Sequence, residues 1–115
     1  MAGKILLVDD DAQIRTSLSE ALEDFGFRVD LAESAEAALS AISASKPQVV
    51  LSDIRMPGLD GIQLLKLLKE RIPEVDVVLM TAFDDMPTVV SAMREGAFDF
   101  LVKPVNLDEL EEVLR

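Results

Sequence analysis

The feature that most constrains the fold is an alternation of short apolar runs with stretches of helical periodicity. Residues 5–8, 49–51 and 77–80 are continuously apolar, whereas residues 27–31 and 98–102 mix charged with apolar positions. Strands that alternate with helices form a parallel sheet covered by helices on both faces. The sequence therefore predicts a doubly wound α/β domain with five strands and five helices.

The order of the strands follows from their patterns. Inner strands of a sheet covered on both faces are continuously apolar, whereas charged positions are tolerated at the edges. Together with right-handed crossovers this favours the flavodoxin-like order 2-1-3-4-5. In that order the chain switches direction between the first and third strands, where open α/β sheets bind their ligands.

The five helices are predicted from apolar spacing and from the residues that begin or end helices. The first buries a stripe from Ile14 to Phe25 and ends at Gly26, and the second buries Ala35 to Ile42. The others are expected at about 61–72 before Pro73, at about 87–95 before Gly96, and from Leu107 after the cap Asn106.

Size and composition exclude several classes of protein. A chain of 115 residues is one domain by size, and without cysteine it has no disulfide or thiolate site. Its apolar runs are too short to span a membrane, so we expect a soluble, cytoplasmic protein without a membrane partner. The net charge of −11 argues against direct nucleic-acid binding. With no histidine, any chemistry rests on carboxylates, lysine, hydroxyls and a metal.

Polar residues follow four of the predicted strands. Asp9 and Asp10 follow the first, Asp53 the third, Thr81 the fourth and Lys103 the fifth. Because parallel strands bring their carboxyl ends to one edge, these side chains are expected to meet. Carboxylates in a small space repel one another unless a cation joins them, and Mg²⁺ prefers such oxygen ligands. The set predicts a metal and phosphoryl site.

Simpler roles are open to each residue alone. Asp11 is better explained as the N-cap of the first helix than as a ligand. Asp53 is also compatible with the start of a turn, Thr81 with an ordinary strand-end hydroxyl and Lys103 with a solvated charge. Capping does not explain acids on both sides of the switch point, so for Asp9, Asp10 and Asp53 together the functional interpretation is preferred.

The motifs resemble those of a known family. Val8-Asp9-Asp10, Asp53 with Met56-Pro57 and Asp60-Gly61, Thr81-Ala82 and Lys103-Pro104 are similar to the response-regulator receiver domain of two-component signalling. The resemblance covers essentially the whole chain. Residues 95–100 further resemble the receivers of sigma-54-dependent, NtrC-like transcription activators.

The resemblance implies a role for each site residue. Asp53 would accept a phosphoryl group, and Asp9, Asp10, Asp53 and the backbone carbonyl of Arg55 would hold Mg²⁺ or Mn²⁺. Thr81 and Lys103 would contact the phosphoryl oxygens, and Lys103-Pro104 would be a cis peptide. The donor would be a phosphohistidine of a sensor histidine kinase or phosphotransfer protein. The domain would not be an enzyme, although it would assist its own phosphorylation and dephosphorylation.

The family's switch implies a pair formed by Thr81 and Phe100, with Phe100 filling space that Thr81 vacates. The shift would change the surface of the fourth helix, fifth strand and fifth helix, a candidate surface for homodimers or effectors. That surface contains Arg94, Glu95, Asp99, Asp108, Glu109 and Glu112. We also hypothesise that Arg55 and Phe83 govern access of water to the acyl phosphate.

Residues 1–115 are expected to be a receiver whose last helix is cut short, with an output domain, for example for transcription, outside this sequence. Three alternatives remain at this point. A Mg²⁺-dependent phosphohydrolase with an Asp nucleophile generally needs a second carboxylate just after it, and position 55 is Arg. A flavodoxin-like cofactor carrier would need a loop that cradles phosphate. A degenerate receiver would act by protein contact alone.

Overall fold

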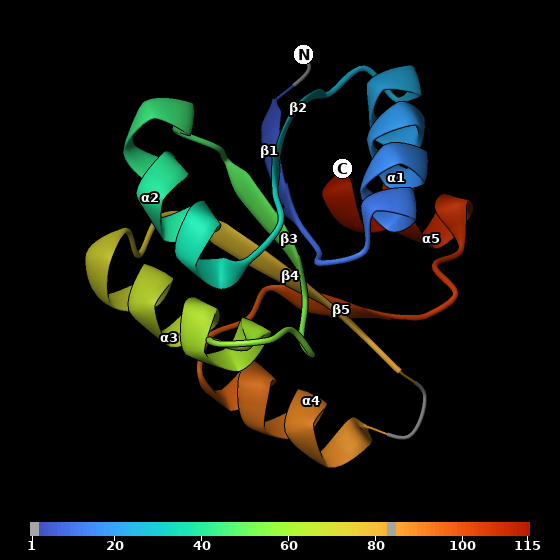
Figure 1. Cartoon of the computed structure of the whole chain (residues 1–115). Coiled ribbons are helices and arrows are strands. Elements are labelled where there is room, and N and C mark those ends of the chain that lie inside the picture. Colours follow the sequence, from blue (N-terminus) through green and yellow to red (C-terminus); the bar gives the residue numbers. More distant parts are fainter. Residues whose placement is uncertain (1–2, 83–84) are drawn as a thin grey trace.

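The computed structural model describes residues 3–82 and 85–115, which form one five-stranded parallel sheet with helices on both faces (Figure 1). The strands lie in the order β2-β1-β3-β4-β5. Their bounds are β1 Lys4–Val8, β2 Arg28–Ala32, β3 Val49–Asp53, β4 Asp76–Thr81 and β5 Asp99–Val102. The predicted fold class and strand order are confirmed.

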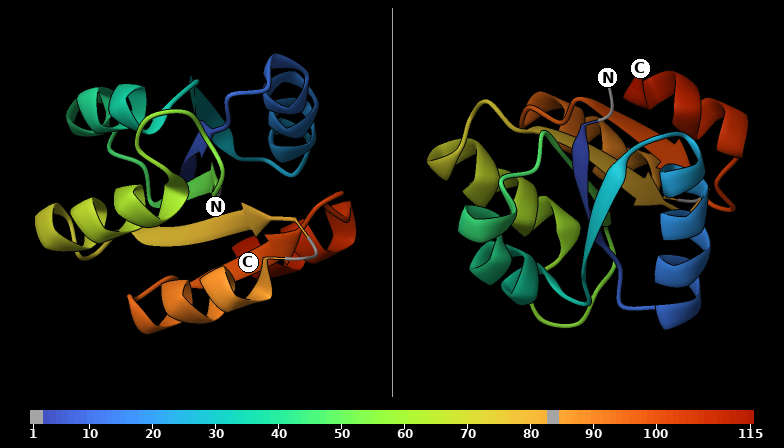
Figure 2. Two further views of the ribbon diagram at one scale, coloured as in Figure 1. Left: turned by 60° about the horizontal axis from the view of Figure 1, so that its bottom comes forward. Right: turned by 90° about the horizontal axis from the view of Figure 1, so that it is seen from above.

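Helices cover the sheet unequally, with three on one face and two on the other (Figures 1 and 2). Helices α2, α3 and α4 pack on one face, and α1 and α5 on the other. Their bounds are α1 Ala12–Asp24, α2 Ala35–Ser45, α3 Gly61–Arg71, α4 Met86–Arg94 and α5 Leu107–Leu114. None of the described helices is long and apolar enough to cross a membrane.

The alternation of side chains along each strand creates two separate cores. Leu6, Val50 and Leu79 face α2, α3 and α4, whereas Leu7 and Met80 face α1 and α5, and all five are essentially inaccessible to solvent. Because both faces are buried, the inner strands have no polar face. This explains the continuous apolar runs of β1, β3 and β4.

The helix boundaries follow capping chemistry. The Asp11 carboxylate accepts hydrogen bonds from the amides of Gln13 and Ile14, so its predicted role as an N-cap is confirmed. Asn106 caps α5 in the same way. The fourth helix begins at Met86, one residue before the predicted Pro87, because proline is well tolerated in the first turn. The predicted starts of α3 at Gly61 and α5 at Leu107 are confirmed, and the ends of α1, α3 and α4 come one or two residues earlier than predicted.

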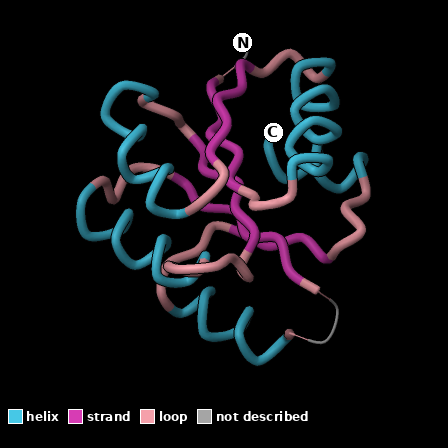
Figure 3. The backbone as a smooth tube through the Cα atoms, in the orientation of Figure 1, coloured by secondary structure: helices cyan, strands magenta, loops and turns pink. Residues whose placement is uncertain are grey.

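The tube representation shows the strands running through the centre and the loops gathering at their ends (Figure 3). The loops after β1, β3, β4 and β5 all leave from the carboxyl edge of the sheet, as parallel strands require. The polar residues predicted to follow these strands therefore lie at one edge.

Candidate functional site

Lys103 joins two buried carboxylates from different strand ends. Its Nζ atom lies 3.0 Å from Asp53 Oδ2 and 3.2 Å from Asp9 Oδ2. Asp53 is the last residue of β3, Asp9 follows β1, and Lys103 follows β5. The lysine thus crosses the switch point and brings three strand ends into direct contact, as predicted.

Asp9 is fixed from three sides and is fully buried. Its Oδ1 atom accepts a hydrogen bond of 2.9 Å from the amide of Asp11, while Oδ2 faces Lys103. The guanidinium of Arg15, one turn into α1, donates to the Asp9 carbonyl oxygen at 2.6 Å. These contacts together fix the position of the Asp9 carboxylate.

Asp10 completes an acidic cluster. One carboxylate oxygen from each of Asp9, Asp10 and Asp53 lies within 4.8 Å of the others, and Asp10 is exposed while its two neighbours are buried. Hard oxygen donors at this spacing, open on one side, suit Mg²⁺, which keeps several waters. The donor set therefore fits a divalent cation.

The electrostatics of the site reflect burial and crowding. Burial raises the pKa of Asp53 above its usual 3.8, and the Asp9 carboxylate adds to this, although the hydrogen bond and charge of Lys103 oppose it. Burial alone lowers the pKa of Lys103, but the Asp53 and Asp9 carboxylates outweigh it, so this pKa is raised above 10.5. Lys103 is therefore a cation held between two acids.

Thr81 and Phe100 share one face of the sheet. Leu79 pairs with Phe100 and Thr81 with Val102. Phe100 therefore lies two residues before the partner of Thr81, on the neighbouring strand. Thr81 is buried and its hydroxyl donates to the Ala82 carbonyl oxygen at 3.2 Å. Phe100 is half-buried against the core formed with α2, α3 and α4. The predicted switch residues are therefore placed near each other.

The loop after β3 depends on a close approach of two backbone segments. The amide of Gly61 donates to the Ile54 carbonyl oxygen at 2.8 Å. A Cβ atom at position 61 would lie 2.8 Å from Ile54 Cα and would collide with the Asp53 carbonyl oxygen. The glycine of the Asp60-Gly61 motif thus allows α3 to begin directly against the backbone of Asp53.

Sequence reasoning missed two participants near the site. Arg15 is one, because nothing in its helical spacing points to the Asp9 carbonyl. Asp85 is the other: it is buried, and its carboxylate contacts Thr88 and Arg55. An acid just before a helix is usually interpreted as a cap, and no sequence signal pairs it with Arg55. Phe83, expected to act with Arg55, lies outside the described residues.

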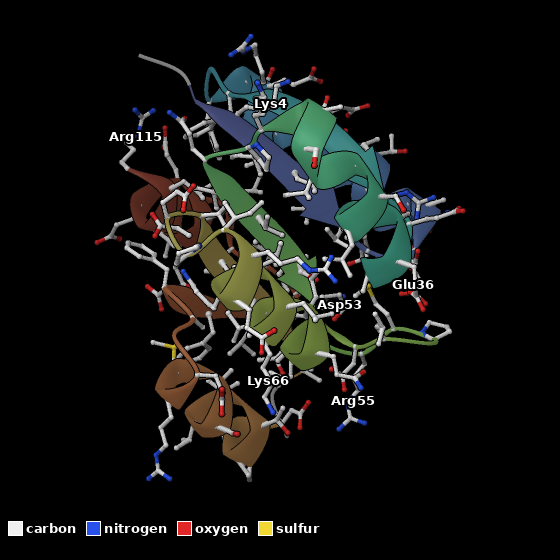
Figure 4. All side chains as sticks on the ribbon, turned by 90° about the vertical axis from the view of Figure 1, so that its left-hand side faces the viewer. Lys4, Glu36, Asp53, Arg55, Lys66 and Arg115 are labelled. Atoms are coloured by element: carbon white, nitrogen blue, oxygen red, sulfur yellow. The ribbon has the colours of Figure 1, made fainter. Side chains whose placement is uncertain are left out.

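Several expectations about surfaces and backbone can be placed in the structure. The Lys103-Pro104 peptide is cis, as the resemblance implied. Asp99 is half-buried, and the other charged residues of the α4-β5-α5 surface are exposed: Arg94, Glu95, Asp108, Glu109 and Glu112. The Arg55 side chain is exposed. Figure 4 shows Asp53 among the interior side chains and Arg55 below it in that view.

Known proteins are similar to this chain in sequence and in fold. The response regulator receiver domain family matches residues 5–115. The chain is 46% identical over 107 residues to the DNA-binding transcriptional regulator NtrC of Salmonella typhimurium, covering 93% of this chain and 23% of that protein. It is 47% identical over 114 residues to the response regulator protein FleR of Pseudomonas aeruginosa, covering 99% and 24%.

A solved receiver domain from Clostridium thermocellum superposes with a TM-score of 0.94 at 33% identity, covering 99% of this chain and 91% of that one. The chain thus spans about a quarter of the length of NtrC and FleR but nearly all of a separate receiver domain. The family match covers both the acidic cluster and Lys103. The chain belongs to the response-regulator receiver domain family of two-component signalling.

Proposed function

We propose that this receiver is a switch operated by phosphorylation of Asp53. The observation that carries the proposal is the position of Lys103, whose ammonium bridges Asp53 and Asp9 beside a third carboxylate, Asp10. A carboxylate is a weak nucleophile toward an anionic phosphoryl group, so positive charge at this point is required. Lys103 supplies it from the chain itself.

In the proposed step, an Asp53 carboxylate oxygen forms a bond to phosphorus while the bond from phosphorus to the donor breaks. With a phosphohistidine donor, the imidazole nitrogen leaves with the electron pair of the P–N bond. Because the chain has no histidine, the donor belongs to a partner, either a sensor histidine kinase or a phosphotransfer protein. Lys103 and the Thr81 hydroxyl would then face the transferred oxygens.

Asp9, Asp10, Asp53 and the Arg55 carbonyl would hold Mg²⁺, or Mn²⁺ in its place. When bound, the cation would offset charge on the phosphoryl oxygens as they approach the acidic cluster. The rigid support of Asp9 by Asp11 and Arg15 keeps its carboxylate in position for this role. Asp10, being exposed, would complete the site from the solvent side.

The output would pass through Thr81 and Phe100. If the Thr81 hydroxyl turns to the phosphoryl group, Phe100 can occupy the space it leaves on the same face of the sheet. The population would then shift between two packings that differ at the α4-β5-α5 surface. Through that surface the domain would form homodimers or act on an output domain, with transcription the output that similarity to NtrC and FleR suggests.

The competing function is a Mg²⁺-dependent phosphohydrolase with Asp53 as nucleophile. Such an enzyme needs an acid and base beside its nucleophile, and position 55 instead carries an arginine paired with Asp85 at 3.3 Å. The lack of a second carboxylate at position 55 favours a phosphoprotein over catalytic turnover of small phosphate esters.

The test is intact mass after incubation with Mg²⁺ and acetyl phosphate. One phosphoryl adduct is expected on the wild-type chain, and none on Asp53→Asn or after removal of metal with a chelator. Glu74→Gln, at an exposed position far from the site, is the matched control and should be modified like the wild type. An adduct on Asp53→Asn, or catalytic hydrolysis of a small phosphate ester by the wild type without any adduct, would contradict the proposal.

A further inference from the structure

Asp85 forms a polar junction between the loop that follows the phosphoacceptor strand and the start of α4. Its Oδ2 atom lies 3.3 Å from Arg55 Nε, and its Oδ1 atom accepts a hydrogen bond of 2.7 Å from the Thr88 hydroxyl. The Asp85 side chain is only 8% exposed, whereas that of Arg55 is 75% exposed. A buried acid is thus paired with a cation that is free to move on its outer side.

Helix capping does not explain these contacts of Asp85. Asp85 stands at the N-cap of α4, but its carboxylate accepts no hydrogen bond from the first-turn amides of this helix, all of which are described. A hydrogen bond from Thr88 lowers the pKa of Asp85 below its usual 3.8, with burial opposing this and Arg55 and Thr81 reinforcing it. Asp85 is therefore an anion that contacts both Arg55, in the loop after β3, and Thr88, in the first turn of α4.

Arg55 has both a reason and the room to leave Asp85. Arg55 is two residues beyond Asp53. A phosphoryl group on Asp53 would replace one carboxylate charge with about two negative charges. An open cavity of about 490 Å³ lies beside the pair, lined by Arg55, Asp85, Thr88 and Met56 among others. A guanidinium binds phosphate oxygens in a forked geometry that a carboxylate already paired with Thr88 offers less fully.

We propose that Asp85 is a positioning residue that holds the Arg55 side chain away from Asp53 until Asp53 is phosphorylated. The phosphoryl group then competes with Asp85 for the guanidinium. This inference rests on the proposed function of Asp53. It assigns to Asp85 a control over the lifetime of the phosphorylated state, because Arg55 covers a phosphoryl oxygen only when Asp85 releases it.

The same competition reaches α4. Val89 and Ala92 are the buried residues of this helix, all of whose residues are described, while Met86, Val90 and Met93 form an exposed apolar stripe. The helix is therefore held by a small apolar contact and by the junction at its first turn. When Arg55 leaves, Asp85 loses its ionic partner at a buried position, which is costly. The start of α4 is then the element that must adjust.

The first experiment follows loss of the phosphoryl group from purified, phosphorylated protein in Mg²⁺, using intact mass against time. Wild type, Arg55→Gln, Asp85→Asn and the double variant form a double-mutant cycle. Asp85→Asn should slow dephosphorylation several-fold, because freed Arg55 covers the phosphoryl group and hinders water. In the Arg55→Gln background the same change at position 85 should have no effect on the rate.

Glu111→Gln is the matched control, since it also removes an acid paired with an arginine, Arg115, but on α5, which packs on the opposite face of the sheet from α4. It should leave the rate unchanged. An Asp85→Asn effect of equal size with and without Arg55 would overturn the proposal, because Asp85 would then act by some route other than Arg55. A rate unaffected by Asp85→Asn would overturn it as well.

The second experiment uses unphosphorylated protein, so it tests the Arg55–Asp85 ion pair independently of phosphorylation. Methyl NMR of Met86 reports on the start of α4, and the fully buried Met80 of β4 serves as the internal reference. Arg55→Gln and Asp85→Asn should each shift the Met86 methyl signal and leave Met80 in place. An unmoved Met86 signal would show that the pair does not hold α4. Failure of the wild type to take any phosphoryl group would instead refute the proposed function, and with it the competition for Arg55, whatever the methyl spectra show.

Discussion

At the scale of single residues, the proposed phosphoacceptor Asp53 lowers the stability of the fold. Its carboxylate is buried beside Asp9, and this raises its pKa in the folded state although Lys103 is in contact. Below pH 3.8 the carboxyl group is protonated in both folded and unfolded chains. As the pH rises past 3.8 and through the higher folded pKa, the unfolded chain loses its proton first, so folding stability falls. The carboxylate of the proposed nucleophile thus lowers the stability of the fold.

Asp53→Asn should therefore raise the free energy of unfolding at neutral pH, and its advantage over the wild type should shrink as the pH falls toward 3.8. Urea unfolding at a series of pH values measures this. Glu74→Gln removes the same charge from an exposed position and should show no such pH dependence. A variant at position 53 that is less stable than the wild type at neutral pH would mean that the Lys103 pair outweighs the burial of the carboxylate.

Gly61→Ala should destabilise the fold and impair phosphorylation together. The added Cβ atom would collide with the Asp53 carbonyl oxygen and approach Ile54 Cα to 2.8 Å, and both are backbone atoms that cannot turn aside. Forcing extra volume into such a site costs about 1–3 kcal/mol. Thermal unfolding and the yield of phosphoryl adduct measure the two effects, and wild-type values for both would show that the β3-α3 loop tolerates the shift.

At the scale of elements, Asp11 has two distinct roles at the start of the first helix. Its carboxylate caps α1, whereas its backbone amide donates to Asp9. Asp11→Ala should thus cost about 1 kcal/mol of stability, as loss of a cap does, and leave phosphorylation intact. Ser34→Ala, which removes the cap of α2, is the comparison and should cost a similar amount. Loss of phosphorylation in the first variant alone would make the Asp11 carboxylate a metal ligand.

The elements themselves were predictable because their signals are local. The continuous apolar runs of β1, β3 and β4 arise from burial on both faces, and the charged positions of β2 and β5 from their place at the edges. Gly26 ends the first helix with a φ of 98°, a conformation that favours glycine. Strand order then brought Asp9, Asp53 and Lys103 together without any further information.

The contacts that sequence could not predict join segments that are distant along the chain or leave no periodic signal. Arg55 and Asp85 are separated by 30 positions and come from two irregular loops, so their pairing depends on how the loops leave the sheet. Arg15 donates to a backbone carbonyl, which every residue carries and no side-chain pattern reveals. The carboxyl-terminal ends of α3 and α4 shifted by one residue because apolar spacing does not fix the terminal residue of a helix.

At the scale of the whole molecule, the chain carries a net charge of −11 and concentrates three carboxylates at one edge of its sheet. Any salt should stabilise such a protein by screening its general self-repulsion. A cation bound at the cluster adds a different term, which depends on the affinity of that site alone. The two contributions differ in their dependence on the identity of the ion, and this difference makes the site testable without phosphorylation.

Magnesium chloride should thus raise the thermal unfolding midpoint by more than sodium chloride at equal ionic strength. At a free Mg²⁺ concentration 100-fold above its Kd, the excess corresponds to about 2.7 kcal/mol. Asp10→Asn should abolish most of this excess, because it removes the exposed carboxylate of the proposed cation site while leaving the contacts of Asp9 and Asp53 with Lys103 intact. Glu74→Gln lowers the total charge equally and should retain the excess. If both variants lose the Mg²⁺ effect to the same degree, the stabilisation comes from the overall charge, and the acidic cluster is not the binding site.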